Sequence, residues 1–326
     1  MGKKIPSYQK INYALRASKN IERKMLVQVF RRLASFRPLH DYQYIGFGSL
    51  YFSDFILFHK ILGMTKMVSI ECDESARERF EFNKPYGYID LQFGYSNTVL
   101  PEIDLSDQAI IWLDYDGKLD KNVLGDITIL LNKIRSGVMI LFTINVHPDA
   151  DSDAEGLTTE QKSEQRIERF GKSVGKENIP ITTSKKDYTP RDFPSLCKKV
   201  IEAKIAQTLT HRNNPVPPEQ QLNCSQVVYF NYNDGVSMST IGYVFYSNED
   251  VTKFNESNFS DLPFFNDTDT PYKIDFANLT QREARYIESL IPIDYTALQS
   301  KGIPIKDIVN YENTYLYYPH YIEVGS

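Results

Sequence analysis

The first half of the chain alternates short apolar runs with amphipathic stretches. Five runs have the length of buried strands and lie at 43–46, 66–71, 88–93, 109–114 and 138–144. Helical patterns separate several of them, at 50–62, 73–83 and 120–135, the last with Asp120 as a candidate N-cap. Strands that alternate with helices in this way predict an α/β fold with a parallel sheet and right-handed crossovers.

The second half of the chain departs from this alternation. Residues 148–222 contain an acidic loop, a polar helical stretch at 158–172 and another helix at 193–211, which predicts a helical insertion or lid. Two strand-like runs follow at 225–232 and 238–247, joined through Asn-Asp-Gly, a strong signal for a hairpin turn. We therefore expect a Rossmann-like, mostly parallel sheet that ends in an antiparallel hairpin.

The ends of the chain are predicted to add helices to this sheet. Residues 8–36 have a helical pattern whose apolar positions share one face: Met25, Leu26, Val29, Phe30 and Leu33. A further helix is predicted near 280–291. The expected division is a basic helical arm (1–40), a main domain (41–247) that carries the insertion at 148–222, and a C-terminal extension (248–326).

Charge is distributed unevenly along the chain. The total is −5, yet the first 40 residues hold ten Lys or Arg and one acid, a net +9, so the rest carries −14. This asymmetry predicts an arm that contacts nucleic-acid phosphates through Arg16, Lys19, Arg23, Lys24, Arg31 and Arg32. The alternative is an amphipathic helix docked on an acidic body. Four tail tyrosines would stack on bases or else pack an interface: Tyr315, Tyr317, Tyr318 and Tyr321.

Composition excludes several classes of protein. No apolar run approaches the 18 residues of a membrane span, and the opening MGKKIPSYQK lacks the apolar segment of a secretory signal. Cys72, Cys197 and Cys224 are far apart and form no zinc-binding pattern. We expect a cytoplasmic protein in a reducing compartment, without a metal.

The ends of the first two strands carry residues suited to a nucleoside. In open α/β sheets, ligands bind outside the carboxyl ends of the strands. The first strand ends in Gly46, Gly48 and Ser49, and Tyr51 replaces the third glycine of a dinucleotide turn, so no pyrophosphate is expected here. Glu71 ends the second strand, where an acid accepts hydrogen bonds from ribose hydroxyls. The alternative is a plain turn and a capping acid.

The ends of the third and fourth strands extend this site. The third leads into Tyr95 and Ser96, which would stack on an adenine ring or contact its edge. The fourth ends in the sequence LDYDG, with Asp114 and Asp116. A carboxylate at the end of a buried strand is costly unless it is paired or used, so this is the predicted reaction centre. The alternative is that Asp116 and Gly117 form only a turn.

Taken together, the strand ends resemble those of class I S-adenosylmethionine-dependent methyltransferases. The resemblance covers residues 40–147 and 225–247. It implies that Gly46 and Gly48 lie under the methionine part of the donor, that Glu71 holds its ribose, and that LDYDG lies near the methyl group. The chain departs from the family at two points, because Gln43 or Tyr44 replaces the acid before the first glycine and the third strand lacks its acid.

The resemblance implies in-line transfer of a sulfonium methyl group to an oxygen or nitrogen of an acceptor. Asp114 or Asp116 would orient or deprotonate the acceptor, and His147 is a second candidate base. Asp114 and Asn145 are expected at neighbouring strand ends, but two oxygen ligands are too few to predict a metal.

Two further hypotheses remain open. The missing acids favour a catalytically inactive methyltransferase-like module that binds or senses a ligand within an assembly, whereas the two acids of LDYDG favour an enzyme. An NAD(P)-linked oxidoreductase is disfavoured by Tyr51. The sequence leaves the acceptor open among small molecules, proteins and nucleic acids, and leaves homo-oligomerisation open.

Overall fold

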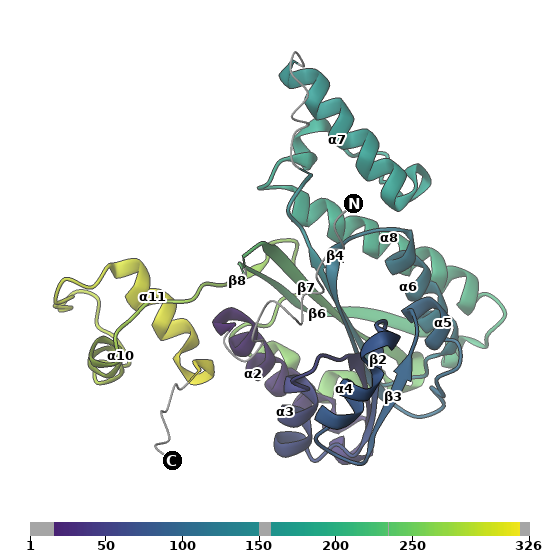
Figure 1. The fold of residues 1–326 in the computed structure, drawn as a ribbon, viewed down its shortest axis with the longest axis horizontal. Helices are drawn as coiled ribbons and strands as arrows, with labels where there is room; N and C mark the ends of the chain where they lie inside the picture. Colours follow the sequence, from purple (N-terminus) through teal and green to yellow (C-terminus); the bar gives the residue numbers. More distant parts are fainter. Residues whose placement is uncertain (1–15, 150–157, 234, 320–326) are drawn as a thin grey trace.

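The computed structural model describes residues 16–149, 158–233 and 235–319. Eight strands of this part form one sheet (Figure 1). They are β1 (Gln43–Phe47), β2 (Lys66–Glu71), β3 (Ile89–Phe93), β4 (Ala109–Lys118), β5 (Val138–Asn145), β6 (Leu222–Asn233), β7 (Ser237–Ser247) and β8 (Tyr272–Ile274).

The strand order is β3-β2-β1-β4-β5-β7-β6-β8. The first five strands in sequence run parallel, β7 is antiparallel to β5, and β6 is antiparallel to β7. The predicted mostly parallel sheet with its terminal hairpin is therefore confirmed. The three-residue edge strand β8, parallel to β6, was not predicted, since so short a run carries no clear period. The order reverses between β1 and β4, which is where open α/β sheets bind ligands.

Helices cover both faces of the sheet (Figure 1). One face is packed by α2 (Ala17–Arg32), α3 (Ser53–Leu62) and α4 (Arg77–Asn83), and the other by α5 (Ser96–Val99), α6 (Lys121–Lys133) and α8 (Phe193–Asn213). Successive residues of β4 point to opposite sides, so Ile110 and Trp112 join one core while Ile111 and Leu113 join the other. This burial on both faces explains why β4 is apolar without alternation.

Local signals set the limits of these helices. The Asp120 carboxylate accepts hydrogen bonds from the backbone N–H groups of Asn122 (2.9 Å) and Val123 (3.0 Å), which confirms the predicted N-cap of α6. Gly63 ends α3 with a φ of +73°, a left-handed conformation that glycine adopts without steric cost.

Helix α2 belongs to the body of the domain and is not a peripheral arm. Its predicted apolar face is confirmed, because Met25, Leu26, Val29 and Phe30 are fully buried against α3 and the sheet. Lys19, Glu22 and Arg23 are buried as well. The prediction that Lys19 and Arg23 contact external phosphates is therefore wrong for these two side chains. The part of the predicted arm at 1–15 lies outside the described residues.

The insertion is narrower than the predicted range 148–222. Helix α7 (Thr159–Val174) stands away from the sheet in Figure 1. Helix α8 instead packs beside α6, and its Val200 and Ile201 are fully buried in the core of that face. Its apolar positions therefore make it the crossover helix between β5 and β6, whereas α7 has a polar surface on most of its length.

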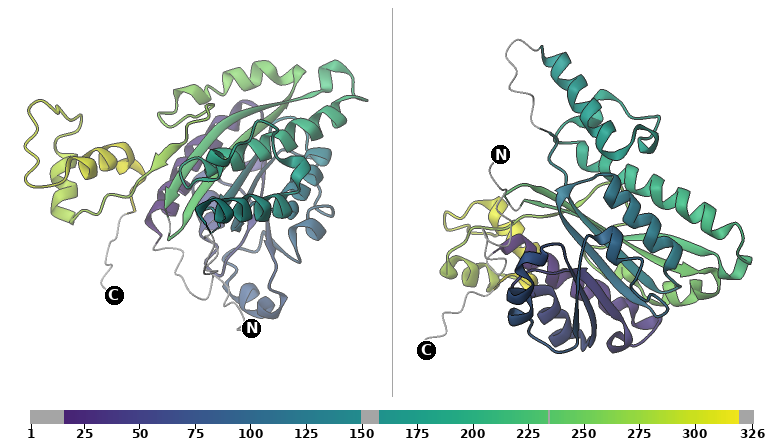
Figure 2. Two further views of the ribbon diagram at one scale, coloured as in Figure 1. Left: turned by 90° about the horizontal axis from the view of Figure 1, so that it is seen from above. Right: turned by 45° about the vertical axis from the view of Figure 1, so that its right-hand side comes forward.

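The later part of the predicted C-terminal extension forms a small unit beside the main body (Figure 2), whereas Phe259, Phe264 and Ile274 of its earlier part pack in the core of the main sheet. After α9 (Val251–Glu256), α10 (Gln281–Glu288) and α11 (Ile305–Thr314) bury their own cluster, which includes Ile287, Ile303 and Ile308. Lys24 Nζ of α2 donates to the Tyr318 carbonyl at 2.8 Å and connects this unit to the domain. No helix among the described residues is long and apolar enough to cross a membrane.

The tail tyrosines take part in packing. Tyr317 contacts Phe264 edge to face, at a centroid distance of 5.7 Å, and Tyr318 stacks on Phe276 at 4.8 Å. These contacts favour the packing role over base stacking for both rings. Tyr321 lies outside the described residues.

Candidate functional site

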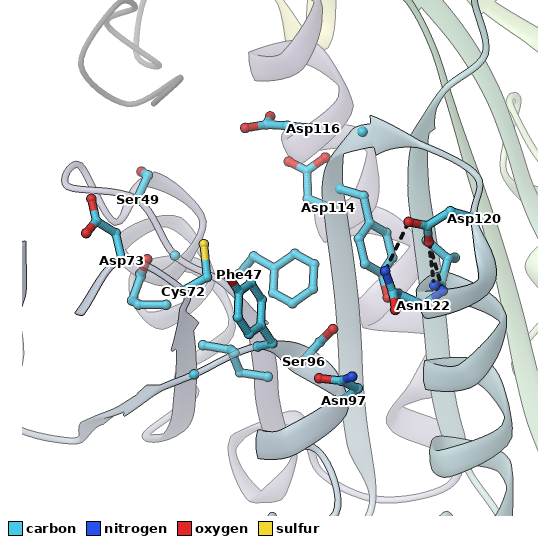
Figure 3. A pocket seen from close by; sticks show the side chains of 18 of the residues that line it. Phe47, Ser49, Cys72, Asp73, Ser96, Asn97, Asp114, Asp116, Asp120 and Asn122 are labelled. Carbon is cyan, nitrogen blue, oxygen red and sulfur yellow. Dashed lines mark hydrogen bonds between the residues drawn. The ribbon is translucent and has the colours of Figure 1, made fainter. Parts of the chain in front are cut away.

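A cavity of about 820 Å³ opens at the carboxyl ends of β1, β2 and β4. This volume suits a ligand the size of a nucleoside derivative, with room for more. Figure 3 shows Ser49, Cys72 and Asp73 on one side of the hollow and Asp114 and Asp116 on the other. Residues from the first, second and fourth predicted strand ends therefore line one cavity.

Gly48 makes room for two polar side chains of β2. A Cβ atom at Gly48 would lie 1.9 Å from Glu71 Oε1 and 2.1 Å from Ser69 Oγ. Such approaches are impossible, so only glycine allows this carboxylate to lie against the turn. Gly48 thus serves the placement of Glu71.

Glu71 presents a buried carboxyl to the cavity. Ser69 Oγ donates to its Oε1 at 3.0 Å. Burial raises the pKa of Glu71 to about 8, which the Ser69 hydrogen bond opposes only in part. Such a group gains from further hydrogen-bond donors, and the two hydroxyls of a ribose are donors of this kind.

Gly46 lies within β1, just before this turn, and contacts the Tyr44 ring. It is absent from the cavity lining, and a Cβ there would lie 2.7 Å from the Tyr44 hydroxyl. Gly46 therefore lies over the buried ring of Tyr44 and outside the lining of this cavity. Ser49, Tyr95 and Ser96 do line the cavity, with Tyr95 largely exposed at its rim.

Asp114 is held by a buried lysine from α2. Lys19 Nζ lies 2.8 Å from Asp114 Oδ1 and 2.8 Å from Glu22 Oε2, and its cation sits 4.3 Å from the centre of the Trp112 ring. Burial acts to lower the pKa of Lys19, but the charges of Asp114 and Glu22 outweigh it and raise that pKa well above its usual value. Lys19 therefore stays protonated and balances charge beneath the site.

Glu22 extends this network into the sheet. Thr240 donates to Glu22 Oε1, and the hydroxyls of Thr240 and Thr143 lie 2.7 Å apart. Trp112 Nε1 donates to Thr143 at 2.9 Å. Burial raises the pKa of Glu22, although Lys19 opposes the shift. These hydrogen bonds join four elements, α2, β4, β5 and β7, beneath the site.

A second buried ion pair joins α2 to α3. Arg23 Nε donates to Asp54 Oδ1 at 2.6 Å, and the Tyr44 hydroxyl donates to Asp54 Oδ2 at 3.4 Å. Arg23 and Asp54 both line the cavity. The Nη1 atom of Arg23 is buried and has no hydrogen-bond partner within the described part of the chain.

Two rings and a buried acid shape the wall below β4. Phe47 and Tyr115 meet edge to face, with centroids 5.0 Å apart. Tyr115 Oη donates to Asp126 Oδ2 at 2.7 Å, and Ser96 Oγ donates to the same oxygen. Burial raises the pKa of Asp126, and these two hydrogen bonds oppose the shift. The fully buried Asp126 thus orients Tyr115 and Ser96 in the cavity wall.

Asp116 lies near Asp114 at the cavity, whereas His147 does not line it (Figure 3). The His147 backbone N–H donates to the Asn145 side chain at 2.8 Å, and His147 is exposed. The strands of Asp114 and Asn145 are neighbours, as expected, but β4 continues past Asp114 to Lys118. The register therefore places Asp114 opposite Thr143 and Asn145 opposite Lys118. No group of three or more potential metal-ligating His, Cys, Asp or Glu occurs among the described residues.

Several site residues were missed in the sequence: Lys19, Glu22, Arg23, Asp54, Tyr115 and Asp126. The signal was present in α2, where Lys19, Glu22 and Arg23 share the helix face of buried apolar residues. Charges in line with an apolar stripe must be paired when that stripe is buried. Asp54 likewise stands within the otherwise apolar stretch of α3.

Residues 11–326 match the model of a family described as "Putative O-methyltransferase". The resemblance to methyltransferases predicted from the strand ends is confirmed by this match. No curated protein matches the chain in sequence.

Several solved structures are distantly similar to this chain. An O-methyltransferase from Bacillus cereus, in complex with SAH, is 15% identical; the match covers 73% of this chain and 84% of that one, with a TM-score of 0.36. The O-methyltransferase TomG from Streptomyces achromogenes, in complex with SAM, is 13% identical; the match covers 73% of this chain and 92% of that one, with a TM-score of 0.37. Trm1 from Pyrococcus horikoshii, with S-adenosylmethionine, is 12% identical; the match covers 73% of this chain and 57% of that one, with a TM-score of 0.41.

Proposed function

The chain belongs to this family of putative O-methyltransferases, and we propose that it transfers the methyl group of S-adenosylmethionine to an oxygen of its acceptor. The observation that carries the proposal is the juxtaposition, in one cavity, of Gly48 and Glu71 with Asp114. The first two suit a ribose and the third lies at the strand end that faces it across the cavity.

The residues present fit the donor. Glu71 offers a carboxyl in need of hydrogen-bond donors, and Gly48 leaves the room that this carboxyl occupies beside the turn. Phe47 and Tyr115 provide aromatic surface beside them. When bound, S-adenosylmethionine supplies a methyl group already activated by its sulfonium. The protein then needs mainly to align the acceptor and to receive its proton.

Asp114 is the residue best suited to receive that proton. Its Oδ1 accepts a hydrogen bond from Lys19, which fixes the carboxylate at the end of β4. Its side chain is about one-fifth exposed and lines the cavity, so the other oxygen remains accessible to an acceptor hydroxyl. Asp116 is more exposed and suits a role in orienting the acceptor at the cavity mouth.

Calorimetric titration with S-adenosylmethionine, S-adenosylhomocysteine and NAD tests the donor. Micromolar binding of the first two without NAD is expected, and Glu71→Ala should abolish it, whereas Glu102→Ala, at an exposed site outside the cavity, should not. Absence of binding to either adenosyl compound would overturn the proposal.

Transfer of a labelled methyl group tests the reaction. The labelled donor is offered with hydroxylated small molecules, with protein and with RNA, and the product is identified as an O-methyl or N-methyl group by mass spectrometry. An N-methyl product would refute the oxygen acceptor. Donor binding without transfer to any class would favour the inactive binding module.

A further inference from the structure

Arg23 carries a buried guanidinium whose hydrogen bonds are largely unused. The side chain is 6% exposed and lines the cavity with Gly48 and Ser49. Within the described residues its one hydrogen bond runs from Nε to Asp54 Oδ1, and Nη1 is buried without a partner. A guanidinium has five N–H donors, and burying them unpaired is costly. The position therefore calls for an anionic ligand.

Asp54 holds this guanidinium in a fixed orientation. One of its oxygens accepts from Arg23 Nε and the other from the Tyr44 hydroxyl. Because the ion pair uses Nε, the Nη atoms remain available, and two N–H groups of a guanidinium match the two oxygens of a carboxylate. Asp54 thus orients the Arg23 guanidinium and leaves its Nη donors for a second carboxylate.

The location of Arg23 relative to Glu71 indicates which part of a ligand would carry the carboxylate that Arg23 binds. Glu71 ends β2, Gly48 follows the adjacent strand β1, and Asp54 lies in the first turn of α3, beyond Gly48. Arg23 lines the same cavity as Glu71, Gly48 and Asp114, so a donor whose ribose is held by Glu71 would have its methionine part within the reach of Arg23. Two cations, Lys19 and Arg23, face the carboxylates of Asp114 and Asp54 there. With Glu22 also paired to Lys19, carboxylates outnumber cations here. A zwitterionic amino-acid group suits this set, because its ammonium would meet a carboxylate and its own carboxylate would meet the unpartnered Nη1 of Arg23.

We propose that Arg23 binds the carboxylate of the methionine part of the methyl donor and so selects donors that carry an intact amino acid. The inference rests on the proposed function. Arg23 is a specificity residue, since it acts at the end of the donor remote from the ribose.

Three ligands and two variants separate this role from a structural one. S-adenosylmethionine, its decarboxylated analogue and 5′-methylthioadenosine are titrated calorimetrically into the wild type, Arg23→Gln and Arg23→Lys. In the wild type, loss of the ligand carboxylate should weaken binding by about 10- to 100-fold, as for a charge-assisted hydrogen-bond pair. In Arg23→Gln this difference should fall to about threefold or less, with methylthioadenosine affinity unchanged.

The outcomes are distinguishable from a failure of the proposed function. A wild type that binds neither adenosyl compound overturns both proposals. A wild type that binds S-adenosylmethionine and its decarboxylated analogue equally overturns the role of Arg23 alone, even if Arg23→Gln does not fold. Equal weakening of all three ligands in a folded Arg23→Gln would show that the residue acts only through its ion pair with Asp54. Arg23→Lys keeps the charge and should retain an intermediate preference.

Discussion

Lys19 Nζ lies 2.8 Å from Asp114 Oδ1, across 95 residues of sequence. This contact places the first described helix inside the site formed by the strand ends, because the side chain that approaches the β4 carboxylate comes from α2. The same helix supplies Glu22 to the floor and Arg23 to the wall. The N-terminal basic segment is thus, in its described part, a structural component of the site.

Replacement of Lys19 by methionine should destabilise the protein strongly. The variant leaves Asp114 and the buried Glu22 without their cation, and breaking a buried ion pair costs about 3–5 kcal/mol. Urea denaturation measures the change in unfolding free energy. Lys24→Met on the same helix is the control: its ammonium meets a carbonyl at the edge of the domain, and we expect a loss of about 1 kcal/mol or less. Equal losses in the two variants would contradict the central role of Lys19.

Asp114→Asn should separate donor binding from turnover. The amide can still accept the Lys19 hydrogen bond but cannot take a proton, so donor affinity should change little while turnover falls about 10²- to 10⁴-fold. The measurement pairs donor titration with initial rates on the acceptor found by labelled transfer. Asp116→Asn, at a more exposed position, should lower turnover less. Normal methylation by both variants would place the reaction centre elsewhere.

Glu71→Gln should stabilise the ligand-free protein at alkaline pH. The pKa of Glu71 is about 8 in the fold against about 4.5 when unfolded, so between these values the native state holds a proton that the unfolded state has lost. The unfolding free energy of the wild type therefore falls as pH rises through this window. The glutamine variant has no titrating group at this position. Its unfolding free energy should therefore exceed that of the wild type by about 1–3 kcal/mol at pH 8 and by much less at pH 5.

Denaturation of wild type and variant at both pH values measures this difference. Glu102→Gln, which changes an exposed carboxyl, should show no comparable gain. If Glu71→Gln gave the same change in stability at pH 5 and pH 8, the carboxyl of Glu71 would not be held neutral by burial.

Gly48→Ala should reduce donor affinity by displacing Glu71. The added Cβ would lie 1.9 Å from Glu71 Oε1, so the carboxylate must move out of its position. We expect about a tenfold loss of affinity, the worth of one good hydrogen bond. Gly117→Ala is a matched control in the same cavity lining, because a Cβ there has no neighbour within 4 Å. Equal affinity in the two variants would refute the Gly48–Glu71 arrangement.

The sequence alone was enough to predict the seven longer strands and most of the helices between them. The apolar runs that became β4 and β5, the N-cap at Asp120 and the hairpin between β6 and β7 all rest on interactions within a few residues or on burial of a whole strand. Gly48 and Glu71 could also be predicted from the sequence as site residues, because the carboxyl ends of parallel strands lie at the same edge of the sheet.

The tertiary structure alone decided which side chains meet there. Strand register separated Asn145 from Asp114, and packing of α2 brought Lys19 and Arg23 to acids 95 and 31 residues away. Such contacts depend on how a helix rotates and docks on the sheet, which its own periodicity leaves open. The charge pattern of α2 was visible in the sequence, but the partners that neutralise it appear only once the helix is buried.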